Sequence, residues 1–173
     1  MRDKLRRRYQ VQKEVTRNGY FEGEFAQSEL HRLQQLLHLE DCAPNGRSVA
    51  VSFEFMRSEF DVPMVVGQLK TSLDLECQRC LRRLEMPMDL EFRLMIDADD
   101  EMVKASSIDT LYSDDGFIDI FELIEDELIL AIPLVALHED TACNEHWRVS
   151  ASATGTADKE NPFAVLKQLK TTD

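Results

Sequence analysis

The chain has 173 residues, which is enough for one domain with its own hydrophobic core, and its longest apolar run has ten residues, too few to span a membrane. It carries 20 basic and 33 acidic side chains, a formal net charge of −13, so broad nucleic-acid binding through the body of the protein is disfavoured. The N-terminus lacks the apolar core of a secretory signal, and we therefore expect a soluble, cytoplasmic protein whose four cysteines are reduced.

Residues 1–18 form a basic N-terminal segment. Its first 17 residues contain seven basic and two acidic side chains, a net charge of +5. Because the segment has no sustained apolar period, we predict a flexible arm. The cluster Arg6, Arg7 and Arg8 is its candidate RNA contact, and a solvated terminus without a role is the alternative.

Residues 19–149 are predicted to form a single α+β domain. A short strand is expected at Tyr20–Phe25, and Ser28 is placed to cap a leucine-rich helix over Ser28–Leu39. From Val49 to Ile96, apolar and polar residues alternate in three runs separated by short turns. This alternation predicts an antiparallel β-meander.

Two residues of the meander have special backbone properties. Gly67 is a candidate β-bulge, because glycine inside a strand often marks one. Pro87 has no N–H to donate, so we expect its strand to lie at an edge of the sheet at that point.

Two cysteines three residues apart, Cys77 and Cys80, lie between the second and third runs of the meander. A position in a strand-to-strand turn disfavours a thioredoxin-like redox centre, which needs a helix directly after the cysteines. The pair is compatible with half of a zinc site. The alternative is a pair of small buried thiols that pack as hydrophobic groups.

Residues 97–127 form the most acidic stretch, with twelve acidic side chains against Lys104 and a net charge of −11. We interpret it either as a solvated loop or as a docking surface for a basic partner, where attraction acts mainly on the association rate. At the end of this stretch, apolar residues at helical spacing predict an amphipathic helix over Asp119–Ile132, ended by Pro133. The candidate partner contacts are Asp97, Asp99, Asp100 and Glu101.

A second pair of soft metal ligands follows this helix. We interpret His138 and Cys143 as the partners of Cys77 and Cys80 in a structural zinc site, because zinc favours four thiolate or imidazole ligands in a tetrahedron. His146 is the rival for the fourth position. The alternative is a cluster of packed free thiols.

The end of the chain is predicted to be a polar linker over residues 150–160, followed by a C-terminal helix and tail over residues 161–173. Pro162 lies at the first helical position of this helix, and lysines lie in its last turn, up to Lys170. The expected fold class is therefore α+β, with an antiparallel β-meander, a leucine-rich N-terminal helix, an amphipathic helix after an acidic loop, and a short C-terminal helix.

Five features of this chain occur in the order of a known family. They are Phe21 to Leu33, Leu75-Glu76-Cys77-Gln78-Arg79-Cys80, Ile118-Asp119 leading into Glu125 to Pro133, His138 with Cys143, and Asn161-Pro162-Phe163-Ala164-Val165-Leu166. Over roughly Tyr20 to Lys170, the chain resembles the large ribosomal RNA subunit accumulation protein family, the YceD family. The resemblance implies a bacterial cytoplasmic protein needed for synthesis, processing or stability of the large-subunit (23S) ribosomal RNA. It supplies no established active site.

Three functions follow from these observations. The first is a non-catalytic ribosome-biogenesis factor that holds a basic large-subunit ribosomal protein or binds a pre-ribosomal particle, because an acidic protein can mask the phosphate affinity of a basic one. The second is direct RNA binding through the basic arm. The third is thiol-disulfide chemistry at Cys77 and Cys80. The sequence offers no recognisable nucleophile and base pair, and we therefore expect that the protein is not an enzyme.

Overall fold

The computed structural model describes residues 5–37, 46–97 and 108–144. The chain divides into two compact units, residues 1–137 and residues 138–173. The predicted linker over residues 150–160 and the predicted helix at Pro162–Lys170 lie outside the described residues. Among the described residues, no helix is both long enough and apolar enough to cross a lipid bilayer.

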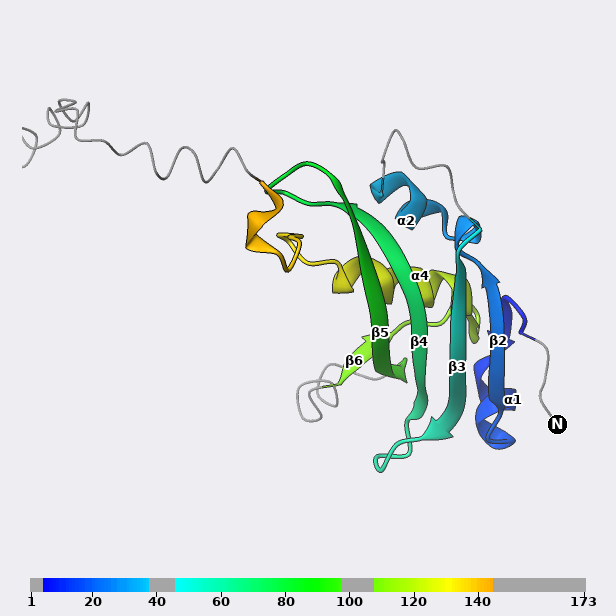
Figure 1. The fold of residues 1–173 in the computed structure, drawn as a ribbon. Helices are drawn as coiled ribbons and strands as arrows, with labels where there is room; N and C mark the ends of the chain where they lie inside the picture. The colour runs from blue at the N-terminus through cyan, green and yellow to red at the C-terminus, as the bar shows by residue number, and fades with distance from the viewer. Residues whose placement is uncertain (1–4, 38–45, 98–107, 145–173) are drawn as a thin grey trace, which may run out of the picture. The chain divides into compact units, whose positions relative to one another are not determined.

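A five-stranded sheet dominates the first unit (Figure 1). Strands β2 to β5 pair antiparallel in chain order, whereas β6 runs parallel to β5. The predicted α+β class and antiparallel meander are confirmed. β6 adds a strand that the sequence did not predict, because three residues are too few to show an alternating pattern. The strands are β2 (Tyr20–Ala26), β3 (Ser48–Arg57), β4 (Pro63–Glu76), β5 (Arg83–Ile96) and β6 (Asp109–Leu111).

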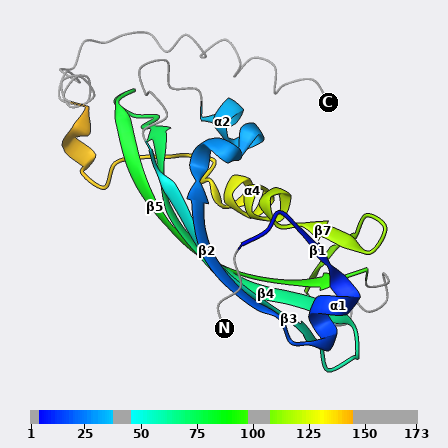
Figure 2. The same cartoon turned by 90° about the vertical axis from the view of Figure 1, so that its right-hand side faces the viewer.

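The alternation of side chains gives the sheet one buried face and one solvent face. In β3, Val49, Val51, Phe53 and Phe55 are at most 3 % exposed, while the residues between them are half-buried or exposed. Helix α4 (Ile120–Ala131) contributes its apolar side to the same core cluster. Figure 2 shows α4, α2 and α1 on one side of the sheet, so none of these three helices covers its other face.

Helix α4 begins where the sequence predicts. Its N-cap is Asp119, whose Oδ1 accepts hydrogen bonds from the N–H groups of Phe121 at 2.9 Å and Glu122 at 3.3 Å. These bonds satisfy amides that have no partner within the helix. Ala131 is the last helical residue, two positions before Pro133, which cannot continue a helix. The predicted amphipathic helix is confirmed.

The prediction of a flexible N-terminal arm is wrong for the part of the arm that is described. Strand β1 (Arg8–Gln10) pairs antiparallel with β7 (Phe117–Asp119), and helix α1 (Val11–Thr16) follows directly. Tyr9 is 1 % exposed, and its ring centroid lies 4.5 Å from that of Phe21. The segment folds because a few apolar residues, too few to form a visible period, are buried against the sheet: Tyr9, Val11 and Val15.

A buried carboxylate fixes the same segment. Glu14 is 1 % exposed, and its two carboxylate oxygens accept hydrogen bonds from the guanidinium groups of Arg6, at 3.1 Å, and Arg17. A buried charge is costly unless it is paired and hydrogen-bonded, and two arginines satisfy this requirement here. Part of the basic charge of the segment therefore neutralises a charge inside the fold.

The leucine-rich helix is shorter than predicted, and Ser28 does not cap it. A 3₁₀ turn, η1 (Gln27–Glu29), precedes α2 (His31–Leu36), which has no side-chain cap of its own. Instead, the N–H of Leu33 donates to Glu125 Oε1 at 3.0 Å. A carboxylate from α4 thus satisfies an amide of α2, and no local residue is needed.

The pKa of Glu125 reflects this arrangement. Burial tends to raise it, but hydrogen bonds from Leu33 N–H and from Arg32, whose Nε lies 2.9 Å from Oε2, outweigh burial and hold the pKa below its ordinary value. A carboxylate with a lowered pKa stabilises the fold above its unfolded-state pKa, and the contribution is lost as the pH falls through the folded-state value. The contact between α2 and α4 therefore weakens in acid.

Gly67 is not a bulge. It pairs in regular register with Phe53 on β3 and with Phe92 on β5. A Cβ at this position would lie 2.5 Å from the carbonyl oxygen of Ser52 and 2.6 Å from Phe92 Cζ. Glycine is required here because neighbouring groups approach the backbone closely.

The predicted sheet edge at Pro87 is confirmed. Pro87 pairs with Ser72 of β4. Among the described strands, only β6 pairs with the other side of β5, and it does so at Leu94–Ile96. The missing N–H of Pro87 therefore costs no hydrogen bond within the sheet.

The turn between β4 and β5 contains a residue with a left-handed backbone. Leu81 has a φ of 58°, and its N–H donates to the carbonyl oxygen of Cys77 at 2.8 Å. The side chain of Leu81 is 70 % exposed, so it gains little from burial. Glycine adopts this conformation without the steric cost that leucine has.

Gly67→Ala is expected to lower the free energy of unfolding by about 1–3 kcal/mol, because the added methyl group overpacks the sheet. Urea denaturation measures this change. Gly46→Ala is the matched control, since nothing lies within 4 Å of a Cβ at Gly46. Equal stability of the two variants would contradict the assignment of close approach at Gly67.

Leu81→Gly is expected to raise the free energy of unfolding by about 0.5–1 kcal/mol, because relief of the left-handed strain exceeds the entropic cost of glycine. Thermal unfolding monitored by circular dichroism tests this. Leu81→Ala keeps a Cβ at the strained position and should show no gain. A less stable glycine variant would show that the leucine side chain itself stabilises the turn.

Candidate functional site

The turn that carries Cys77 and Cys80 is closed by its own backbone and held from one side. The N–H of Cys77 donates to the carbonyl oxygen of Arg82 at 2.9 Å. Gln78 is anchored to the chain that follows α4, because its N–H donates to Ala136 O and its Nε2 donates to Leu134 O, both at 2.9 Å. Cys77 is buried and Cys80 is half-buried. The strand ends and these bonds therefore fix the backbone that carries both thiols.

The second predicted pair of ligands lies in the second unit, on a short ordered stretch. A 3₁₀ turn, η2 (Thr141–Cys143), follows Asp140, whose Oδ1 accepts a hydrogen bond from Ala142 N–H at 2.7 Å. The N–H of Cys143 donates to the carbonyl oxygen of Asp140 at 3.2 Å. Local hydrogen bonds thus set the backbone that carries the Cys143 thiol.

The four predicted ligands come together. The ligand atoms of Cys77, Cys80, His138 and Cys143 all lie within 4.8 Å of one another. In a tetrahedral zinc site with Zn–S bonds of about 2.3 Å, ligand atoms are separated by about 3.8 Å. Three thiols and one imidazole are the donors that zinc prefers in closed, structural sites. His146, the rival ligand, lies outside the described residues.

The three arginines predicted to contact RNA all have partners within the protein. Arg6 pairs with Glu14 at 3.1 Å, Arg7 with Asp119 at 2.7 Å and Arg8 with Asp114 at 3.5 Å. The hydrogen bond to Asp119 raises the pKa of Arg7 above its ordinary value. The pairs occupy much of the positive charge that a phosphate would require, and RNA contact through these residues stays a prediction.

Part of the charge of residues 97–127 is balanced in space. The arginines of the N-terminal segment pair with Asp114 and Asp119, and Arg32 pairs with Glu125 and Asp126 at 2.9 and 2.7 Å. Of the candidate partner contacts, only Asp97 is described, and its carboxylate accepts hydrogen bonds from Ser113. Asp99, Asp100 and Glu101 lie outside the described residues, so this docking surface remains a prediction.

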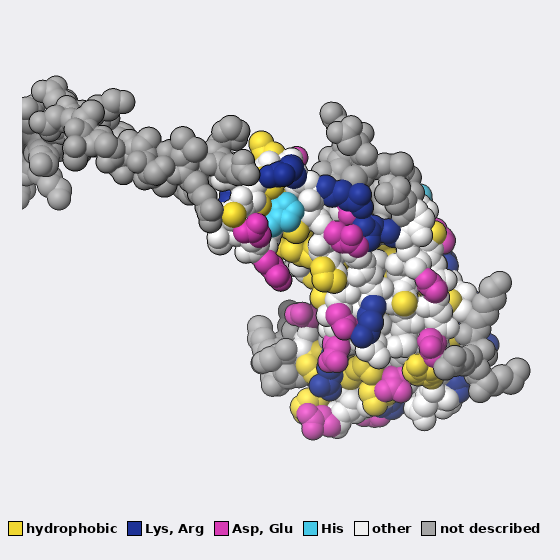
Figure 3. All heavy atoms as spheres, viewed as in Figure 1, with side chains coloured by type: hydrophobic (Ala, Val, Ile, Leu, Met, Phe, Trp, Pro, Cys, Tyr) yellow, Lys and Arg dark blue, Asp and Glu magenta, His cyan; other side chains and the backbone are white. Residues whose placement is uncertain are grey.

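No residue on the solvent face of the sheet was predicted from the sequence to have a functional role. Two adjoining hollows of about 400 and 310 Å³ lie there and share Ser52 and Gln68. Figure 3 shows acidic side chains on this face, which is viewed from the side opposite to α4. The available signal was the polar half of the strand alternation, which is usually taken as solvated surface. The carboxylates that line the hollows are Glu22, Glu24, Glu54 and Glu91.

Comparison with known proteins identifies one family. Residues 65–170 match the model of the family described as large ribosomal RNA subunit accumulation protein YceD. The protein of that name from Haemophilus influenzae is 34 % identical over 149 residues, which cover 79 % of this chain and 82 % of the relative. No solved structure matches the chain. The predicted resemblance is thereby confirmed: the chain belongs to the YceD family of large ribosomal RNA subunit accumulation proteins.

Proposed function

We propose that this protein supports the accumulation of large-subunit 23S ribosomal RNA as a non-catalytic, cytoplasmic factor that binds a basic large-subunit ribosomal protein. The supporting observation is the net charge of −13 on a member of a family named for ribosomal RNA accumulation. Ribosomal proteins must neutralise RNA phosphates and are as a class basic. An acidic factor attracts such a protein, alone or within a pre-ribosomal particle, and masks its nonspecific affinity for phosphate. Accumulation of the RNA would then follow indirectly.

Direct RNA binding through the N-terminal segment has less support. Affinity for RNA depends on basic side chains that exchange counterions for phosphates. Arg6, Arg7 and Arg8 already contact carboxylates, and their guanidinium groups lie over aromatic rings at 5.0 to 5.8 Å. Binding a phosphate would require these contacts to weaken.

Thiol-disulfide chemistry also has less support. A catalytic pair needs an accessible thiol that is ionised near neutral pH, commonly at the start of a helix. Cys77 is 0 % exposed, and the strand β5 follows the turn instead of a helix. This geometry suits a ligand or a packed thiol better than a nucleophile.

The cysteine cluster supports a structural zinc ion as part of the same proposal. Cys77, Cys80, His138 and Cys143 supply four ligands, which leaves no open position for substrate. The metal would stabilise the fold, because a site of this kind rarely persists in the unfolded chain. The role of zinc here is therefore stability of the factor, with no part in a reaction.

Removal of the protein from its bacterium is expected to lower the ratio of large-subunit to small-subunit ribosomal RNA, measured by gel electrophoresis of total RNA.

Purification of the protein at low salt should retain basic large-subunit ribosomal proteins after nuclease treatment. These partners should dissociate at about 1 M salt, where charges are screened beyond roughly 3 Å.

The nuclease step separates the two binding hypotheses. Retention of protein partners after digestion supports binding to protein. If RNA is the retained species, and all protein partners leave with it, the protein-binding proposal is wrong. Deletion of residues 1–18 would then have to abolish RNA retention for the arm to be the contact.

Protein purified without an affinity tag is expected to contain about one zinc ion per chain by elemental analysis. Cys77→Ser should lose the metal and lower the Tm by more than about 5 °C, because metal binding contributes to folding. Cys42→Ser is the matched control, since it removes a cysteine outside the four ligands and should keep both metal and Tm.

The fourth ligand can be assigned in the same way. His138→Ala should lose zinc, whereas His146→Ala should retain it; the reverse result would assign the rival histidine. The zinc site would be falsified if the wild-type protein is metal-free with four reduced cysteines and has the same Tm as the Cys77→Ser variant.

A further inference from the structure

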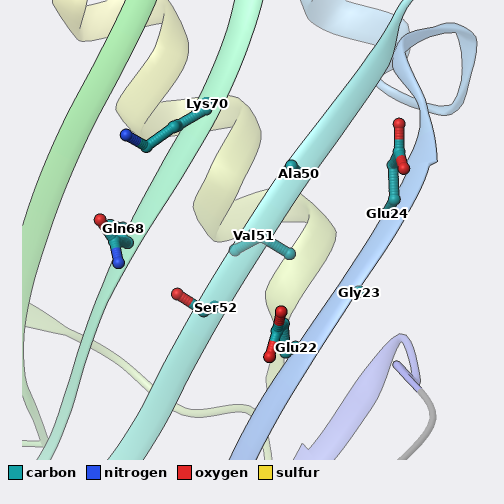
Figure 4. A pocket seen from close by; sticks show the side chains of 8 residues that line it. All are labelled: Glu22, Gly23, Glu24, Ala50, Val51, Ser52, Gln68 and Lys70. Carbon is teal, nitrogen blue, oxygen red and sulfur yellow. The ribbon is translucent and has the colours of Figure 1, made fainter.

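The solvent face of the sheet is the most distinctive surface of the first unit that the proposed function does not use. No described helix of this unit covers it, and it carries the two adjoining hollows, the first of which is drawn in Figure 4. We propose that this face binds a lysine- and arginine-rich segment of a protein partner. The inference rests on the proposed function and names the surface that would carry it.

The hollows exist because their floor is made of small residues. Ala50 and Ser52 of β3 form the floor of the first hollow, and Ser52 also lines the second. In Figure 4, Glu22 and Glu24 lie along one side of the first hollow, and Gln68 and Lys70 lie along the other, with α4 behind the strands. A long, thin side chain can lie on such a floor with its charged end at a carboxylate wall.

The charge of the hollows matches a basic side chain. Four carboxylates line them, against one ammonium group, that of Lys70. Lys70 is already paired with Asp89 at 2.8 Å. Among the described residues, no basic side chain pairs with Glu24, Glu54 or Glu91, and all three are exposed. Binding a guanidinium or ammonium group here would add opposite charge without breaking an ion pair of these three residues.

On the other half of the same face, acidic and basic side chains pair with one another. Asp74 accepts hydrogen bonds from both Arg47 and Arg83 at 2.8 to 3.3 Å, and Arg47 also pairs with Glu85 at 3.0 Å. These side chains satisfy one another across neighbouring strands. A solvated face with no partner could have used the same pairing throughout, but Glu24, Glu54 and Glu91 have no such pair with a described residue.

The chemistry of the hollows also argues against other occupants. A phosphate backbone would be repelled by the four carboxylates. An apolar segment would find few apolar side chains to pack on, since Val51 and Phe53 are buried and Ala50, Val66 and Tyr20 are the other apolar side chains of the lining. Lysine and arginine side chains combine an apolar stem with a charged end, which fits both the small-residue floor and the acidic walls.

A 12-residue peptide of alternating arginine and threonine is the probe, and its binding to the full chain is measured by fluorescence anisotropy at low salt. Glu24→Gln combined with Glu54→Gln is expected to weaken binding about 2- to 30-fold, because each exposed ion pair contributes modestly. Glu29→Gln combined with Glu59→Gln is the matched control. It removes the same charge from exposed positions away from the hollows and should change binding less than about 2-fold.

Glu91→Gln is an independent variant on β5 and should also weaken binding, while a peptide of alternating glutamate and threonine should not bind. If both double variants weaken binding equally, only net charge matters and the surface assignment is overturned, although the proposed function stands. If the wild-type protein does not bind the peptide but still retains basic ribosomal proteins in cell extracts, the assignment is overturned as well. Failure of both assays would overturn the proposed function itself.

Discussion

The need to cover one apolar sheet face is the constraint on which the rest of the first unit depends. Phe21, Phe53 and Leu69 project from three neighbouring strands and are at most 1 % exposed. Each such side chain contributes on the order of 1.5–3 kcal/mol when it leaves water, so a bare meander would lose most of its stabilisation. Helix α4 and the N-terminal segment both pack against this face. The sheet supplies apolar surface that residues 5–18 lack by themselves, which explains why so weakly patterned a segment is folded.

Charge pairs also form between the two most unbalanced segments of the sequence. The N-terminal segment and the acidic stretch are far apart along the chain, yet Arg7 and Arg8 pair with Asp119 and Asp114 beside the β1–β7 ladder. These arginines are more than half exposed, so each pair contributes little stability. The pairs reduce the electrostatic field at the protein surface, so the net charge of a segment overstates the field that acts on a binding partner. We therefore expect the carboxylates without a basic neighbour to contribute most to the proposed binding.

Local features of the sequence were predictable, and contacts between distant residues were not. The buried face of β3 and the cap at Asp119 follow from alternation and from residue type, which need no knowledge of the fold. By contrast, the N–H of Leu33 donates a hydrogen bond to Glu125, which is 92 residues away in the sequence. No periodic pattern in the sequence predicts such a bond. The candidate metal ligands could be predicted because few kinds of side chain coordinate zinc, so residue type alone restricted the choice. The left-handed backbone of Leu81 could not be predicted, because this conformation is normally inferred from a glycine and the residue here is leucine.

The solvent face shows why a strongly acidic composition does not by itself locate a binding surface. Polar residues at alternate positions of a strand are the default for a sheet with one open face, and the sequence cannot tell which of them are paired. Ion pairs on this face form between residues of different strands. Asp74 of β4 pairs with Arg47, which directly precedes β3, and with Arg83 of β5. Glu24 and Glu54 pair with no arginine or lysine among the described residues. Screening reduces attraction beyond about 8 Å at physiological ionic strength, so a partner close to the sheet responds to these local differences more than to the total charge. In the function we propose, the total charge of −13 attracts a basic protein, and Glu24 and Glu54 beside a floor of small residues are the place where it binds.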